Sequence, residues 1–414
     1  MRTYEGKTIM ILGAGQLQVP IIQRAKEKGL KVIVVSPGVE EPGMQYADIV
    51  VPLDVKDEQG ILAAAKDYQI DGITTDQTDL PVRTAAYVAE KMGLPGIGYE
   101  LGCLFTDKYK QRQKCRELGV PTPDFARVRT AAEAEAFLMR CGTAIIMKPV
   151  DSQASHGVSK ITERSQIASC FDEAVRYSRT GDVLVEQWVE GIEFPADSYV
   201  VNGNCRVLSI GQYHPFSVEG VFSSYNTVWP ANQPEEVLNL IRETNKAIVE
   251  GFGLKQGRTH GEYIVSNGNC YLVEIGARGG GSFFSSDDIR YTTGFCSEDF
   301  LIDTALGLQV DDFSCGGQQF FCCSTLFFYL PEGTVESVDG VEQVQTLDFV
   351  KRNNLDQIRI GMKTRPVIDK GARYFMIVAA DSYSQLDERI SLIRNMLRIM
   401  TRTEAQKSEL PIWK

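Results

Sequence analysis

The sequence predicts a mixed α/β and α+β protein with an N-terminal parallel αβ domain, a two-part central core and a small α+β C-terminal lobe. Short apolar strands alternate with helical patterns over the first hundred residues. Strands separated by helices form a parallel sheet with right-handed crossovers. From residue 119 onward, several strands follow one another through turns such as Asn202-Gly203, which is typical of antiparallel hairpins.

The N-terminal domain is expected to contain four strands and three helices. The strands are 7–13, 30–38, 47–54 and 70–76, and the helices are 16–29, 57–69 and 80–96. Ligands of such sheets bind at the carboxyl ends of the strands. Asp76, Asp79 and Arg83 follow one strand end and either frame that cleft or, for Asp79 before Leu80-Pro81, cap the next helix.

The rest of the chain is expected to be richer in strands. The predicted elements are a helix at 106–119, a strand within 119–128, two strands and a loop at 143–161, several strands at 183–213, a long helix at 234–253, a hairpin at 258–281, strands within 320–330 and 373–380, and a helix at 384–400. The hairpin turns at Ser266-Asn267-Gly268. Neither an internal repeat nor a low-complexity linker separates these parts, so we expect the lobes to pack together.

Composition excludes several classes of protein. The 414 residues are 43% hydrophobic and carry a net charge of −11, which argues against a nucleic-acid binder with a general basic surface. Ten cysteines without a CxxC pair and three histidines make a zinc site improbable. No signal peptide and no apolar run of roughly 20 residues is present. We therefore expect a cytosolic protein with reduced thiols and no membrane or nucleic-acid partner.

The glycine turn at 13–18, GAGQLQ, lies between a strand and a helix, as a dinucleotide-binding turn would. Gln18 stands where that fingerprint has its third glycine, and the second strand ends in Ser36-Pro37 without an acid for a ribose. These departures argue against NAD. A tight structural turn and an anion site at the helix N-terminus both remain open.

The segment 145–160, IIMKPVDSQASHGVSK, places Lys148 at the end of a β-branched strand and a small-residue loop after it. Backbone N–H groups of such a loop can fold over phosphates. It lacks the GxxxxGK[ST] pattern of a P-loop. By itself, the pattern fits an ordinary flexible hairpin loop equally well.

Two acids bracket the segment 183–193, VLVEQWVEGIE. Glu186 ends a strand, and Glu193 follows after Gly191. Both could be solvated edge residues. In an adenosine site, the backbone after Glu186 would pair with the adenine edge and Glu193 would accept from ribose hydroxyls.

The hairpin carries a third pair of acids, Glu262 and Glu274, on paired strands that could point to one face. Two close carboxylates repel each other unless a cation lies between them, and carboxylate oxygens suit Mg²⁺ that bridges phosphates. Exposed glutamates with lysine partners are the alternative. Arg278 and Gly279-Gly280-Gly281 follow at once, which favours a site.

The order of these motifs along residues 1–310 resembles that of the ATP-grasp superfamily. In that family, two α+β subdomains bind ATP between them, and an αβ domain precedes them in the sequence. The C-terminal segment also looks like that of L-amino-acid ligases and carboxylase-like relatives, and the whole is similar to carboxylate–amine ligases of the carbamoyl-phosphate-synthase type. The resemblance implies residues 1–103 as a pre-ATP-grasp domain, 104–308 as the ATP-grasp core with a lid subdomain at about 120–190, and 309–414 as a C-terminal lobe.

The resemblance also implies a role for each motif residue. Lys108 and Lys148 would contact phosphates; Ser155, His156, Gly157 and Val158 would lie in the lid; Glu186, Gln187 and Val189 would line the adenine; Glu193 would bind the ribose; and Glu262 and Glu274 would bind Mg²⁺ or Mn²⁺. Arg278 and Lys148 would be catalytic, and Arg278 would stabilise the oxygen of a tetrahedral intermediate. Two positions depart from the family: Gly276 replaces an asparagine that is a third metal ligand, and His156 replaces an arginine or glycine.

Enzymes of this kind activate a carboxylate as an acyl phosphate with release of ADP, and an amine then displaces phosphate. The resemblance therefore implies a ligase for a small carboxylate and an amine, and a homodimer. Two alternatives remain at this point. One is a carboxylase-like enzyme that activates bicarbonate, against which the lack of Lys or Arg in residues 11–20 counts. The other is a nucleotide-binding protein with impaired catalysis, which Gly276 would explain.

Overall fold

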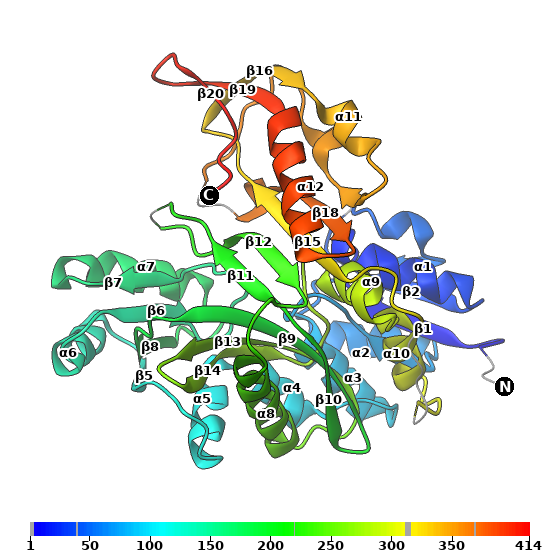
Figure 1. Cartoon of the computed structure of the whole chain (residues 1–414). Coiled ribbons are helices and arrows are strands. Elements are labelled where there is room, and N and C mark those ends of the chain that lie inside the picture. Colours follow the sequence, from blue (N-terminus) through cyan, green and yellow to red (C-terminus); the bar gives the residue numbers. More distant parts are fainter. Residues whose placement is uncertain (1–3, 39, 219, 311–315, 368–369) are drawn as a thin grey trace.

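Five β-sheets organise the chain in the computed structural model, which describes residues 4–38, 40–218, 220–310, 316–367 and 370–414 (Figure 1). The N-terminal sheet has the order β3-β2-β1-β4, and all of its paired strands are parallel. Its elements are β1 (Thr8–Leu12), α1 (Val19–Glu27), β2 (Lys31–Val35), β3 (Ile49–Val51), α2 (Glu58–Asp67), β4 (Gly72–Thr74), α3 (Val82–Met92) and α4 (Tyr99–Phe105).

The central strand β1 is buried on both faces. Ile9 and Ile11 pack with α1 and with α10 (Ser297–Ala305), whereas Met10 and Leu12 pack with α2 and α3. Such two-sided burial explains why the strand is a continuous apolar run. Helix α10 comes from much later in the chain, so the N-terminal sheet and the core share one hydrophobic layer.

Two antiparallel sheets follow. The lid sheet, named here for its loop after β6, has the order β5-β8-β6-β7, and the central sheet has the order β10-β9-β13-β14. The lid-sheet elements are α5 (Lys108–Glu117), which precedes it, β5 (Phe125–Val128), α6 (Ala131–Cys141), β6 (Ile145–Pro149), β7 (Ser159–Ile161), α7 (Ile167–Tyr177) and β8 (Val183–Gln187). The central-sheet elements are β9 (Ile192–Val201), β10 (Asn204–Ile210), α8 (Glu235–Phe252), β13 (Gly257–Ser266) and β14 (Asn269–Gly276).

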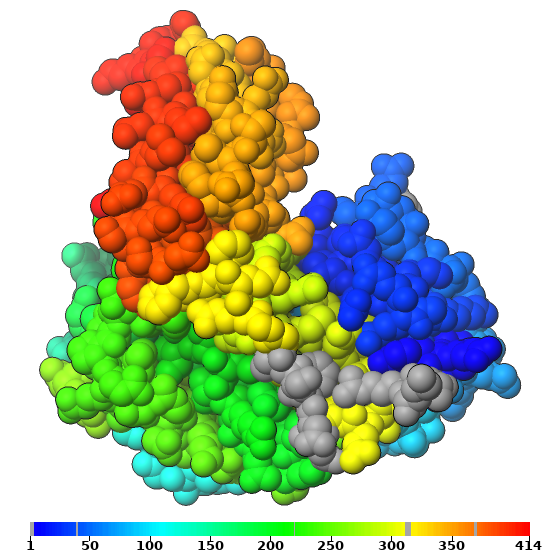
Figure 2. Space-filling view, turned by 45° about the vertical axis from the view of Figure 1, so that its right-hand side comes forward, coloured from blue at the N-terminus to red at the C-terminus, as the bar shows by residue number. Residues whose placement is uncertain are grey.

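The C-terminal part rises above the rest of the molecule in the space-filling view (Figure 2). Its main sheet, the shared sheet, has the order β11-β12-β15-β18-β17 and therefore includes a hairpin from before residue 230. The elements are β11 (Gln212–Pro215), β12 (Ser224–Trp229), α9 (Ile289–Thr293), β15 (Cys322–Phe328), β16 (Gly333–Asp339), α11 (Val341–Gln345), β17 (Val350–Asn353), β18 (Tyr374–Ala380), α12 (Tyr383–Met396), β19 (Arg398–Thr403) and β20 (Ser408–Glu409). Strands β16, β19 and β20 form the fifth sheet.

Shorter helical turns complete the description. They are the 3₁₀ turns η1 (Gln16–Gln18), η2 (Met44–Tyr46), η3 (Arg164–Gln166), η5 (Leu355–Gln357) and η6 (Lys370–Ala372), and the π-turn η4 (Phe284–Asp288). Within the described part of the chain, no helix is both long and apolar enough to cross a membrane.

The structure confirms the mixed α/β and α+β class and the parallel N-terminal sheet. The predicted hairpin 258–281 is β13 and β14. At the glycine turn, the buried Gln18 side chain packs against Gly13 and Gly15, and its amide donates to the Asp76 carbonyl at 2.8 Å. This hydrogen bond of Gln18 thus connects the turn after β1 to the segment that follows β4.

Candidate functional site

Glu262 and Glu274 are directly opposite each other on β13 and β14. Their side chains are 23% and 26% exposed, so both reach a partly open surface. Residues opposite each other on neighbouring antiparallel strands have their side chains on the same face, and like charges there repel. The pair therefore requires positive charge nearby.

Lys108, the first residue of α5, supplies part of that charge. Its Nζ lies 2.7 Å from Oε2 of Glu274 and donates to the Ser152 carbonyl at 2.6 Å. Burial alone would raise the pKa of Glu274, but Lys108, together with Arg278 and Lys148, lowers that pKa to about 2. Burial alone would lower the pKa of Lys108, but Glu274 raises it above its ordinary value. Both groups are thus charged at neutral pH.

Tyr213 on β11 fixes the other carboxylate. Its hydroxyl donates to Oε1 of Glu262 at 2.8 Å, and Nε2 of His260 lies 3.7 Å from the same oxygen. Burial and then Glu262 raise the pKa of Tyr213 well above its ordinary value, so the hydroxyl stays protonated as a donor. Residues of the shared sheet therefore border the carboxylate pair.

Lys148 is the penultimate residue of β6 and lies in a buried charge cluster. Its Nζ is 2.5 Å from Oε2 of Glu186, and Arg112 of α5 contacts the same carboxylate through Nε and, at 3.3 Å, through Nη2. Burial raises and these two cations lower the pKa of Glu186, with a net lowering. Burial lowers the pKa of Lys148, with Arg112 acting in the same direction. The Glu186 carboxylate is therefore occupied by Lys148 and Arg112. Only the backbone at this position could contact a ligand.

The segment predicted to line adenine leaves β8 at Gln187. The N–H groups of Gln187 and Trp188 donate to the carbonyls of Asp124 and Ala144 at 2.8 and 2.9 Å. Val189 is half-buried in the turn that follows. At Gly191, a Cβ atom would lie 2.5 Å from the Val265 carbonyl oxygen, so a glycine is required where the turn crosses β13.

Glu193 is half-buried on β9, opposite Ile264 of β13. The charge of Glu193, like that of Glu262, raises the pKa of Tyr213. The predicted ribose ligand and the carboxylate pair therefore lie within electrostatic reach of one tyrosine.

The loop between β6 and β7 carries the predicted lid residues. The Ser155 hydroxyl donates to the Phe222 carbonyl at 3.2 Å, and the His156 ring stacks on Tyr177 with 5.1 Å between centroids. Gly157 has φ of +70°, a left-handed conformation that favours glycine. The Val158 N–H donates to the Ser155 carbonyl at 3.3 Å. The side chains of Ser155 and His156 thus contact Phe222 and Tyr177, while Ser152 of the same loop contacts Lys108.

Arg278 follows β14 and binds Asp79 in a bidentate ion pair. Nε and Nη2 lie 2.9 and 2.6 Å from the two carboxylate oxygens, and Nη1 donates to the Gly279 carbonyl at 2.9 Å. Burial alone would lower the pKa of Arg278, but Asp79 raises it. The alternative that Asp79 caps the next helix is wrong, because Pro81 is the N-cap residue of α3. Asp79 is instead at the cleft.

A cavity of about 150 Å³ opens beside these groups. Lys108, Glu274, Gly276, Asp79 and the lid-loop residue Gln153 are among its lining residues. The N-terminal domain, the lid loop and the central sheet therefore meet at one hollow. The carboxylate pair Glu262 and Glu274 thus lies near the cations Lys108 and Arg278. The ion pair of Lys148 and Glu186 lies in the lid sheet.

Several contacts at the site were not predicted. Arg112, Tyr213, Gln153 and the Asp79–Arg278 pair all act through long-range contacts. A signal existed for Arg112 alone, which is four residues after Lys108 and so lies on the same face of α5. The other partners come from separate elements.

The two facing carboxylates fit a hard divalent cation. Oxygen ligands from one or two carboxylates, completed by phosphate and water, are the usual environment of Mg²⁺. Among described residues, no cluster of three or more acids, histidines or cysteines with metal-binding geometry occurs. Glu262 and Glu274 would thus hold the ion together with groups that the protein does not supply.

Two family models match separate regions of the chain. Residues 141–287 match the ATP-grasp domain, and residues 6–95 match the ribonucleotide synthetase preATP-grasp domain. The alanine–anticapsin ligase of Bacillus subtilis (strain 168) is 28% identical over 240 residues, which are 53% of this chain and 50% of the ligase. The chain thus spans about half the length of this curated relative.

Solved structures share the complete fold. The L-amino acid ligase from Bacillus licheniformis has a TM-score of 0.82 at 24% identity, over 96% of this chain and 99% of that one. The phosphoribosylglycinamide synthetase from Anaerococcus prevotii has a TM-score of 0.74 at 18% identity, over 95% and 99% of the two chains. The chain therefore has the fold of these structures, with one region that matches the ATP-grasp domain and an earlier region that matches the preATP-grasp domain.

Proposed function

We propose that the protein is an ATP-dependent ligase that activates a small carboxylate, such as an amino acid, as an acyl phosphate and joins it to an amine. The observation that carries this proposal is the arrangement of Glu262 and Glu274, directly opposed on β13 and β14 with Lys108 on one of them and Arg278 nearby. Opposed carboxylates with cations around them suit phosphoryl transfer, which depends on positioning and charge neutralisation.

Roles follow from the contacts. Glu262 and Glu274 would hold Mg²⁺, which supplies positive charge to the nucleotide phosphates. Lys108 and Lys148 would contact the phosphates, Gln187 and Val189 would border the adenine through their backbone, and Glu193 would accept from the ribose. Lys148 already lies beside Glu186, so a bound phosphate would be its second anionic neighbour. Burial lowers the pKa of Lys148, and a second anion would favour its charged form.

A carboxylate oxygen of the substrate attacks the γ-phosphorus of ATP, the bond to the β-phosphate oxygen breaks, and ADP leaves. The amine nitrogen then attacks the acyl carbon, inorganic phosphate leaves, and the amine loses a proton. Arg278 would stabilise the negative oxygen of the tetrahedral intermediate, since its charge is permanent. The loop at 151–158 would keep water from the acyl phosphate.

Two similar proteins, the alanine–anticapsin ligase and the L-amino acid ligase, are named as ligases of amino acids. Their names suggest amino acids as substrates to test first. The protein is expected to work without a membrane partner and as a homodimer.

A bicarbonate-activating enzyme with a phosphorylated substrate is the second candidate. Arg83, Lys110 and Arg179 line the cavity and would suit a phosphate group. Against this, Arg83 is held by Glu58 at 2.8 Å. The candidate therefore ranks below the ligase.

The deciding experiment measures phosphate and ADP release from MgATP. Amino acids and other small carboxylates are crossed with amines, and bicarbonate with aminoimidazole ribonucleotide forms a separate arm. Release that requires both a carboxylate and an amine, with an amide detected by mass spectrometry, supports the ligase. Release that requires bicarbonate moves the protein to the carboxylases, and AMP with pyrophosphate as products contradicts the acyl-phosphate route.

A further inference from the structure

Gly276 is the position at which the sequence lacks the family's third metal ligand, and the structure shows what fills that space. A Cβ atom on Gly276 would overlap Oδ1 of Asp79 and would approach Nε of Arg278 to 3.2 Å. Asp79 belongs to the pre-ATP-grasp domain, almost two hundred residues earlier in the chain. A carboxylate from another domain therefore stands where the side chain of an asparagine at 276 would be.

That carboxylate is fully engaged. Its two oxygens accept from Nε and Nη2 of Arg278 at 2.9 and 2.6 Å, the side-by-side geometry that suits a guanidinium. The Arg278 side chain is 9% exposed and Asp79 is 22% exposed. Because the Gly279 carbonyl accepts from Nη1, contacts fix the guanidinium plane from both ends.

The backbone around Asp79 is also held. The Asp79 N–H and the Thr78 hydroxyl both donate to Oε1 of Gln153, at 2.9 and 3.0 Å. Gln153 belongs to the lid loop, whose Ser152 carbonyl accepts from Lys108. The position of Asp79 is therefore set by the lid loop as well as by its own domain.

We infer that Asp79 is a positioning residue for Arg278, and that Gly276 is a glycine because this carboxylate needs the space. The inference rests on the proposed function, in which Arg278 acts on the oxygen of the acyl intermediate. Asp79 does not act as the missing metal ligand, since Arg278 occupies both of its oxygens.

The test uses four full-length variants, D79A, D79N, G276A and the double variant D79A/G276A. Asp67→Ala, an exposed acid on α2, is the control. Misplacement of Arg278 should lower kcat/KM for the ligase reaction by about 100-fold in D79A, since a shift of roughly 1 Å in a positioned group has that effect. D79N keeps one acceptor oxygen and should recover part of the rate.

G276A should lose activity because its methyl group displaces Asp79, and the double variant should be no worse than D79A alone. Affinity for MgADP, measured by calorimetry, should stay within about twofold in every variant, because the nucleotide contacts are elsewhere. A purely structural role would instead lower MgADP affinity together with the temperature of unfolding. Unchanged kcat/KM in D79A, or losses in D79A and G276A that simply add, would overturn the inference.

If the wild-type protein turns over no pair of substrates, the proposed function fails separately. The inference is then decided by unfolding free energies of the same variants, which need no substrate. A coupling free energy of zero between positions 79 and 276 would refute it, and a non-zero coupling would support the shared space.

Discussion

At the scale of single residues, the site depends on charges that are compensated in pairs. Glu274 is held by Lys108, Glu186 by Lys148 and Arg112, and Arg278 by Asp79. Each of these three carboxylates therefore has a cation beside it before any ligand arrives. A phosphate that enters must compete with these carboxylates for the same cations.

Glu274→Gln should abolish turnover because a neutral amide binds Mg²⁺ more weakly than a carboxylate does and no longer balances the charge of Lys108. The fold should persist, since the amide has the same shape and the side chain is partly exposed. The measurement is product formation against Mg²⁺ concentration, with circular dichroism as the check on folding. Wild-type turnover in this variant would remove Glu274 from the metal site.

Lys148→Ala should weaken MgATP binding by about tenfold or more, which corresponds to the loss of one charge-assisted hydrogen bond. Glu186 keeps Arg112 as a partner, so the buried carboxylate is not left alone. Calorimetric titration with MgATP measures the change, and Lys114→Ala, a half-buried lysine of α5 that pairs with Glu117, is the matched control. Equal affinity in the two variants would contradict the phosphate role of Lys148.

The sequence predicted the acidic and basic members of the site but few of their partners. Motif spacing indicated Glu262, Glu274 and Lys148, because each ends or lies on a strand in a recognisable order. The partner of Arg278 lies 199 residues away, and that of Glu186 lies 74 residues away. No local period connects such positions, so their pairing appears only once the chain is folded.

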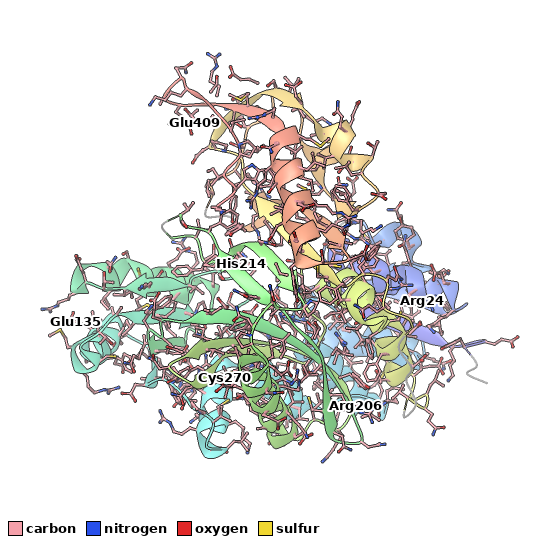
Figure 3. The ribbon with its side chains drawn as sticks, viewed as in Figure 1. Arg24, Glu135, Arg206, His214, Cys270 and Glu409 are labelled. Atoms are coloured by element: carbon pink, nitrogen blue, oxygen red, sulfur yellow. The ribbon has the colours of Figure 1, made fainter. Side chains whose placement is uncertain are left out.

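At the scale of elements, α1 and α10 join the pre-ATP-grasp domain to the core. Arg24 of α1, labelled in Figure 3, binds Asp299 of α10 through Nε and Nη2 at 2.7 and 2.8 Å. Lys28 Nζ lies 2.8 Å from the same carboxylate. Burial raises and the two cations lower the pKa of Asp299, with a net lowering. The ion pairs thus act beside the shared hydrophobic layer of β1, α1 and α10.

Asp299→Asn should destabilise the protein by about 1–3 kcal/mol at pH 7, the usual contribution of hydrogen bonds to a charged group. The folded pKa of Asp299 is below its ordinary value of 3.8, so its stabilisation is present above that pH and is lost as the pH falls. Urea unfolding at pH 7 and at pH 3 measures the difference. A penalty that stays constant between the two pH values would contradict the ion-pair explanation.

The sequence prediction missed helices α10 and α6 for different reasons. Helix α10 was not predicted because Phe300, Leu301 and Ile302 are buried in succession and leave no polar face. Helix α6 was also not predicted, although Thr130 and Glu133 form a capping box and Gly142 ends the helix with positive φ. The first error is a tertiary effect, whereas the second signal was present in the sequence.

At the scale of the whole molecule, buried acids collect where the N-terminal sheet, the central sheet and α10 meet. Glu298 is 3% exposed and Asp76 is fully buried. Burial, with Asp76 nearby, raises the pKa of Glu298 to about 7, and burial raises that of Asp76 to about 6. Both carboxyl groups are therefore protonated in the folded protein at mildly acidic pH.

Glu298→Gln should stabilise the protein at pH 8 and have little effect at pH 4.5. The raised folded pKa means that the wild-type acid favours folding in its protonated form, and this contribution is lost as pH rises from 4.5 to about 7. Gln removes an ionisation cost of up to about 3 kcal/mol at pH 8. Thermal unfolding across pH 4.5 to 8 measures it, and parallel curves for the two proteins would count against a buried ionisation.

The order of the lobes was predictable, but their connection was not. The alternation of strands and helices predicted the parallel sheet, and the motif order predicted the ATP-grasp core. Nothing local indicated that β12 would pair with β15 across more than ninety residues. Strand partners that far apart are chosen by packing and not by turn chemistry.

The pairing of β12 with β15 also bears on how this protein could be recombined. Because strands from two distant regions of the chain form one sheet, the C-terminal lobe cannot be exchanged as an independent unit. A chimera joined near residue 310 would expose the backbone edge of β12, which invites strand addition by a foreign chain. Any graft of this lobe should therefore carry the hairpin β11–β12 with it, so that donor and recipient exchange a complete sheet.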